Sequence, residues 1–193
     1  MATQKLLQVY DTSLLFADET DFPNSGAGPP ETAANDMRVG TGTKVQIDLT
    51  ALAAEAGRQS DKTADLGAAF PRELMLAACI EHEAAPDAGG TIEFWWAGSP
   101  NATPATGNPT GVTGEDGAYT VANKAQLKQI GIMTVIAATI NKETEVGVLT
   151  LKYRYGSLIV INKTSSKFLE TAVAMDNTHI VLTPIIPDLQ AAA

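Results

Sequence analysis

Apolar and polar residues alternate along much of the chain with a period of two, which is typical of β-strands that bury one face. The clearest case is segment 43–50, where Val45, Ile47 and Leu49 alternate with polar neighbours. The same reasoning predicts further strands over 72–83, 91–97, 131–140, 145–155, 157–162 and 179–184. Residues 51–58 contain helix formers in a short run, so we expect one or two turns within a loop there, and we expect a short helix over 122–129.

The connections between these segments are rich in glycine and proline, and no long amphipathic helix alternates with the strands. This arrangement argues against a parallel α/β sheet and favours a sandwich or a barrel. We therefore expect an all-β fold over residues 43–193, an antiparallel β-sandwich of jelly-roll type. Its longest connection, residues 98–119, has a length that is usually either functional or disordered.

Residues 1–42 differ in character, and we expect them to form an extended N-terminal arm. Apolar residues cluster at Leu14, Leu15 and Phe16, and a stretch rich in proline and glycine follows over 22–30. That stretch is incompatible with a helix or a central strand. The arm either crosses the surface of its own domain or reaches a neighbouring subunit, and the sequence leaves both open.

The charge of the chain narrows the range of partners. Lys and Arg number 13 against 22 Asp and Glu, a formal net charge of −9. An acidic surface repels phosphate backbones and anionic lipid heads, so we expect neither nucleic acid nor a membrane as partner. Residues 1–5 lack the features of a signal peptide, and no apolar run approaches a membrane span. We expect synthesis in a cytoplasm, which suits a chain whose single cysteine, Cys79, can form no intrachain disulfide.

The sequence offers little for catalysis. Ser99 lies outside any G-x-S-x-G pattern, and His82 and His179 are the only histidines of the chain. Glu81, His82 and Glu83 are consecutive, but neighbours in a strand point to opposite faces, so their side chains do not converge on one ion. We predict no catalytic residue, no cofactor and no metal site.

Calcium is the one metal that the loops suggest. Glu115 and Asp116, together with Asp87, carry the oxygen ligands that this ion takes. The spaced D-x-D-x-D pattern is missing, however, and acidic residues are common in surface turns. We therefore treat Glu115 and Asp116 as candidate contact residues and not as metal ligands.

Two adjacent tryptophans, Trp95 and Trp96, must point to opposite faces of their strand. Ile92 and Phe94 share one face with Trp96, which we take as the core face. Trp95 then lies beside Glu93 on the other face. There it is an interface anchor, a platform for stacking a sugar, or a residue packed under the long loop. The residues that we expect at an interface are Leu14, Leu15, Phe16, Trp95, Glu115, Asp116 and Tyr119.

Three stretches carry a resemblance to a known kind of protein. They are LFAD (15–18) with TKVQIDLTALAA (43–54) and RQSDK (58–62), GTIEFWWAGSP (90–100) with residues 107–119, and YRYGSLIVIN (153–162) with residues 180–184. Over roughly residues 14–184 the chain resembles small proteins of tailed bacteriophages that are found among the head genes and look like capsid cement, or decoration, proteins.

The resemblance implies a jelly-roll or related β-sandwich, commonly trimeric, that sits where major capsid subunits meet and holds the head against the pressure of packaged DNA. The partners would be the major capsid protein and other copies of the chain, and the location would be the capsid surface of the virion. It implies no catalytic residues. A head–tail or tail component is an alternative within the same class, a carbohydrate-binding module based on Trp95 and the long loop is a second, and an enzyme is a third.

Overall fold

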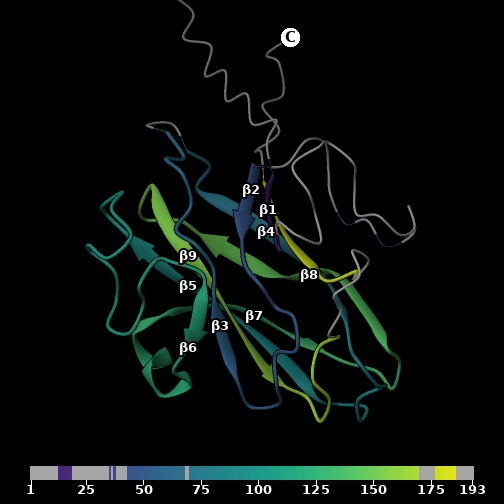
Figure 1. Cartoon of the computed structure of the whole chain (residues 1–193). Helices are drawn as coiled ribbons and strands as arrows, with labels where there is room; N and C mark the ends of the chain where they lie inside the picture. Colours follow the sequence, from purple (N-terminus) through teal and green to yellow (C-terminus); the bar gives the residue numbers. More distant parts are fainter. Residues whose placement is uncertain are drawn as a thin grey trace, which may run out of the picture.

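The alternating segments form strands that hydrogen-bond into one sheet of ten strands (Figure 1). The computed structural model describes residues 13–18, 35, 37, 43–67, 70–169 and 177–185. The elements in chain order are β1 (Leu14–Ala17), β2 (Thr43–Gln46), β3 (Gly57–Gln59), β4 (Glu73–Glu81), β5 (Thr91–Ser99), β6 (Gly117–Tyr119), the 3-10 helix η1 (Val121–Gln126), β7 (Lys128–Thr134), β8 (Ile140–Thr150), β9 (Tyr155–Lys163) and β10 (His179–Pro184). Among the residues described, no helix is long and apolar enough to cross a membrane.

The order of strands in the sheet is β2-β1-β10-β4-β8-β7-β5-β9-β3-β6. Every neighbouring pair is antiparallel except β1 and β2, which run parallel. The expectation of an all-β, mostly antiparallel fold is therefore confirmed. The ladder runs through all ten strands as one sheet curled into a half-barrel, and it does not divide them into the two sheets of a sandwich.

The curl occurs where β7 meets β8. Within the described residues the ladder between these strands consists of one pair, Gly131 with Gly147. A Cβ atom on Gly131 would lie 2.2 Å from the carbonyl oxygen of Val146, and one on Gly147 would lie 2.2 Å from that of Ile130. The two backbones can approach this closely because neither residue has a side chain. We call this pair of glycines the β7–β8 crossing. On either side of it, no further residues of β7 and β8 pair within the described part of the chain.

The curl brings the inner faces of the two halves together around one core. Phe16 of β1 and Trp96 of β5, whose strands are not neighbours in the sheet, meet edge to face with ring centroids 6.5 Å apart. Phe16, Phe94 and Phe168 are among the largest fully buried side chains. Burying a side chain of this size stabilises the fold by about 1.5–3 kcal/mol.

Part of the expected arm belongs to the sheet. Residues 14–17 form β1, which lies between β2 and β10, and all four are buried. The backbone N–H of Met37 donates to Nε2 of His179 in β10 (3.1 Å), and the Met37 side chain packs against Leu15, Ala17 and Val181. At these positions the expected arm therefore packs on its own domain. Apart from residues 13–18, 35 and 37, segment 1–42 lies outside the described residues.

Residues 51–56 form a loop with turns at 50–51 and 54–55, as expected, and no helix is present there. Ala51 and Glu55 adopt positive φ angles of 54° and 63°, which interrupt a right-handed helix, and the segment ends in β3. The strand expected over 43–50 ends at Gln46, although Ile47 and Leu49 remain buried. The helix expected over 122–129 is present as the 3-10 helix η1.

Replacing Gly147 with alanine should destabilise the fold, because the new methyl group meets the carbonyl oxygen of Ile130. We expect the free energy of unfolding in urea to fall by about 1–3 kcal/mol, the usual cost of overpacking. Gly117→Ala is the matched control, since a Cβ there has its nearest neighbour at 3.9 Å. Equal urea midpoints for the two variants would show that the β7–β8 crossing tolerates a side chain.

Candidate binding groove

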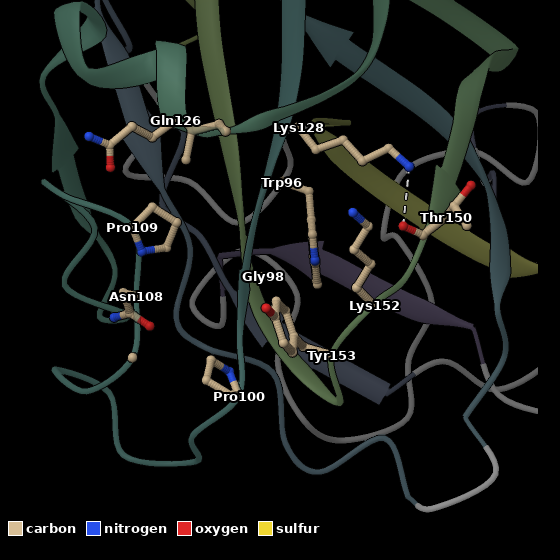
Figure 2. A pocket seen from close by; sticks show the side chains of 12 residues that line it. Trp96, Gly98, Pro100, Asn108, Pro109, Gln126, Lys128, Thr150, Lys152 and Tyr153 are labelled. Atoms are coloured by element: carbon tan, nitrogen blue, oxygen red, sulfur yellow. Dashed lines mark hydrogen bonds between the residues drawn. The ribbon is translucent and has the colours of Figure 1, made fainter.

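A groove with a volume of about 750 Å³ opens beside the β7–β8 crossing (Figure 2). Its lining residues come from β5, the long loop, η1, β7, the end of β8 and the turn before β9: Trp96, Gly98, Pro100, Gly107, Asn108, Pro109, Gln126, Leu127, Lys128, Thr150, Lys152 and Tyr153. A groove of this size is typical of sites for small ligands. We call it the β5 groove.

The floor of the β5 groove is aromatic. Gly98 of β5 and Gly156 of β9 face each other in the ladder, and the Trp96 ring lies against Gly156, where a Cβ would fall 2.3 Å from Cζ2 of the indole. The Tyr153 ring packs on Gly98 at 3.1 Å from the position of a Cβ. The two glycines therefore make room for the two rings, which Figure 2 shows close to Gly98.

The floor also presents a hydrogen-bond donor that is not used. Trp96 is 4% exposed, and its indole N–H has no hydrogen-bond partner in the part of the chain that the structure describes. The indole nitrogen is not one of the fully buried side-chain atoms that lack a partner in the described residues, so it is accessible from the groove. Beside it Tyr153 is 45% exposed, although large apolar rings are usually buried. The floor therefore offers a vacant donor and an open ring face to a ligand.

One wall of the groove is cationic. Lys128 of β7 donates through Nζ to the carbonyl oxygen of Thr150 (3.2 Å), across the gap that opens beyond the crossing (Figure 2). Lys152 follows on the same side and is exposed. None of the twelve lining residues carries a carboxylate. The wall is thus a positive region on a chain whose net charge is −9.

The opposite wall is formed by the long loop, which Lys62 holds in shape. The Nζ of Lys62 lies within hydrogen-bond distance of Ser99 Oγ (3.2 Å) and of the carbonyl oxygens of Asn101 (3.1 Å), Thr103 (2.6 Å) and Thr106 (3.0 Å). Burial lowers the pKa of the Lys62 ammonium. This cluster of contacts fixes the first part of the loop before any ligand arrives, which lowers the entropic cost of binding.

The far end of the loop is fixed by Asp116. Its carboxylate accepts two hydrogen bonds from Arg58 of β3, from Nε to Oδ1 and from Nη2 to Oδ2, both at 2.8 Å, and one from the backbone N–H of Asp48 at 3.2 Å. The hydrogen bond to Asp116 raises the pKa of Arg58. Nearby the N–H of Asp61 donates to the carbonyl of Gln46 (2.9 Å). This cluster, which we call the Asp116 clasp, ties the β2 side of the half-barrel to the β3–β6 side.

The structure places the other expected contact residues in different surroundings. Leu14, Leu15 and Phe16 are 5%, 1% and 0% exposed within β1. Tyr119 is 4% exposed, and its hydroxyl group is buried with no hydrogen-bond partner in the described part of the chain. Glu115 is exposed, whereas its neighbour Asp116 is engaged in the clasp. The expected interface residues are thus not gathered on one surface of this chain.

Trp95 lies on the face expected for it, opposite Trp96. Its indole N–H donates to Oε2 of Glu93 (2.9 Å), and the ammonium of Lys124 sits 5.2 Å from its ring centroid. The ring is partly buried and packs in a cluster with Val112 of the long loop and Tyr119 of β6. Of the three roles considered for Trp95, packing under the loop matches this position.

Neither histidine is open to solvent. His82 is 1% exposed, its two ring nitrogens have no hydrogen-bond partner among the described residues, and its ring meets Phe168 edge to face. His179 is 0% exposed; its Nε2 accepts from Met37, so Nδ1 carries the proton that bonds to the carbonyl of Asn177 (2.8 Å). In the described part of the chain, no group of three His, Cys, Asp or Glu residues is arranged to hold a metal ion.

Comparison with known proteins finds no match: no family model, no curated protein and no solved structure is similar to this chain. The groove therefore has to be interpreted from its own chemistry. Sequence reasoning missed Lys128, Lys152 and Tyr153, because nothing in their local spacing indicates that they meet. The one local signal was Trp96, which the strand pattern assigned to the core and which does reach the floor of the groove.

The Asp116 clasp should contribute measurably to stability. Asp116→Asn removes the charge that pairs with Arg58, and we expect the free energy of unfolding to fall by about 1–3 kcal/mol because a partly buried charge loses its partner. Asp65→Asn breaks the Arg154–Asp65 pair, which is exposed on both sides, and should change stability little. Urea denaturation of both variants makes the comparison. Equal effects would mean that the clasp is an ordinary surface ion pair.

His82 should make the protein less stable in mild acid. Burial lowers its pKa below the ordinary value of 6.5, so below that pH the unfolded chain takes up a proton that the folded chain does not. The contribution of His82 to the free energy of unfolding is therefore complete above pH 6.5. It falls as the pH drops below this value, by at most about 1.4 kcal/mol per pH unit. Urea midpoints measured from about pH 5 to about pH 8 give the slope. His82→Leu should flatten it; an unchanged slope would assign the effect to other groups.

Proposed function

We propose that this chain is a structural protein of a bacteriophage virion, a capsid decoration protein that docks on the major capsid protein and stabilises the head without catalysing a reaction. The observation that carries the binding role is a rigid, preformed surface on a β scaffold whose two histidines are both sealed in the interior. The resemblance of the three sequence stretches supports the virion role. Under this proposal the protein is made in the host cytoplasm and ends on the capsid surface.

The proposal includes a relationship to jelly-roll β-sandwiches. Two features support it. The five strands β2-β1-β10-β4-β8 and the five strands β7-β5-β9-β3-β6 are joined by the single pair Gly131–Gly147 among the residues described. The Phe16–Trp96 contact links the inner faces of these two groups, as facing sheets of a sandwich are linked.

Exposed apolar residues near the β7–β8 hairpin provide a docking surface for this function. Ile132, Ile136 and Val148 are 46%, 65% and 40% exposed. The buried side chain of Asn141 fixes the hairpin, because its Oδ1 accepts from the N–H of Ile136 (2.8 Å) and its Nδ2 donates to the carbonyl of Ala138 (2.7 Å). Apolar side chains held rigidly in solvent are typical of interaction sites. We propose that they contact the capsid protein or a second copy within a trimer.

Capsid binding tests the proposal directly. Purified protein mixed with heads that lack it should co-sediment with them at saturation in a fixed ratio to the major capsid protein. Ile136→Asp should weaken this binding by about tenfold, since it places a charge in an apolar contact. Thr144→Asp adds the same charge at an exposed position of β8 and should bind as the wild type does. Wild-type protein that stays in the supernatant, or that is found only on tails, contradicts the proposal.

A further inference from the structure

The β5 groove has an excess of hydrogen-bond donors over acceptors. The donors that face it are the ammonium groups of Lys128 and Lys152, the hydroxyl of Tyr153 and the vacant indole N–H of Trp96. Gln126 accepts the N–H of Thr110 through Oε1 (3.1 Å), so its amide nitrogen is left as a further donor. No carboxylate is present among the lining residues to accept in return. A ligand that satisfies this set must be rich in acceptors and negatively charged.

The charges of the two lysines are not already neutralised. Lys128 contacts a backbone carbonyl, and neither Lys128 nor Lys152 forms an ion pair with a carboxylate in the described residues. The ion pairs of the other lysines lie elsewhere, for example Lys124 with Glu93 and Lys163 with Glu55. An anion in the groove would therefore not compete with an existing carboxylate.

The backbone around the groove disfavours an extended peptide as ligand. Peptides commonly bind by adding a strand to a free sheet edge. The floor strand β5 is paired with β9 along its whole length and with β7 as far as Trp96, so among the described residues its free edge is limited to residues 97–99, which is shorter than a typical strand. A pyranose ring needs none, because it stacks one face on an aromatic ring and uses its hydroxyl groups for hydrogen bonds.

We propose that the β5 groove binds a carboxylate-bearing oligosaccharide, an activity beyond capsid docking that does not rest on it. One sugar ring stacks on the exposed face of Tyr153. Its carboxylate lies against Lys152 and Lys128, and a ring or hydroxyl oxygen accepts the N–H of Trp96. The volume of about 750 Å³ accommodates a short oligosaccharide and not a folded partner. Neutral sugars fit less well, because the groove has no carboxylate to accept their hydroxyl protons.

The test titrates the full chain with three probes at low ionic strength. Binding is monitored by calorimetry and by tryptophan fluorescence, to which Trp96 on the groove floor contributes. The probes are trigalacturonate, the neutral sugar maltotriose and the peptide tri-glutamate. We expect trigalacturonate to bind at least about tenfold more tightly than either of the others. Added salt should weaken this binding, because it depends on opposite charges.

Variants locate the site. Lys152→Gln changes an exposed side chain and Tyr153→Ala removes the stacking ring, and each should weaken binding of trigalacturonate by about tenfold. Tyr153→Phe keeps the ring and loses only the hydroxyl donor, so it should weaken binding less than Tyr153→Ala does. Lys163→Gln removes a lysine outside the groove and is the charge-matched control. No response of the wild type, maltotriose binding as tight as trigalacturonate, tri-glutamate binding tighter than it, or full binding by Lys152→Gln would each overturn the proposal.

Discussion

The close approach of two backbones at Gly131 and Gly147 is the constraint on which the rest of the structure depends. A side chain at either position would strike a carbonyl oxygen of the other strand, so the close approach of β7 and β8 requires glycine at both. The crossing turns the sheet back on itself and brings Phe16 to Trp96. It also creates the groove, because Lys128 and Thr150 lie on the strands where they separate beyond the crossing and are joined only through a side chain.

The rigidity of the groove comes from the polar contacts that hold the long loop. Lys62 gathers the first part of the loop around one ammonium group, and Asp116 secures its far end to Arg58 and to the backbone of Asp48. A loop of this length without such contacts would lose much conformational entropy on binding. Here that cost is met during folding, so the wall that faces the lysines is in place before a ligand arrives.

The long alternating strands were predictable from sequence, since β4, β5, β8, β9 and β10 bury one or both faces over many residues. β1, β3 and β6 have four residues or fewer, too short for a period of two to be recognised. The groove could not be predicted, because Trp96, Lys128 and Tyr153 come from strands and turns that only the crossing brings together. Asp116, which the sequence offered as a contact residue, forms an ion pair with Arg58 inside the fold. Trp95, the other candidate, is covered by the loop.

The central claim is that the sheet turns back on itself so that its two halves share one core. The most direct test is a solution NMR measurement of nuclear Overhauser effects between the ring protons of Phe16 and Trp96. These residues lie on β1 and β5, which are separated in the sheet by the four strands β10, β4, β8 and β7. Clear cross-peaks between the two rings are expected, because their centroids are 6.5 Å apart. A Phe16 ring whose cross-peaks are confined to β2 and β10 would contradict it.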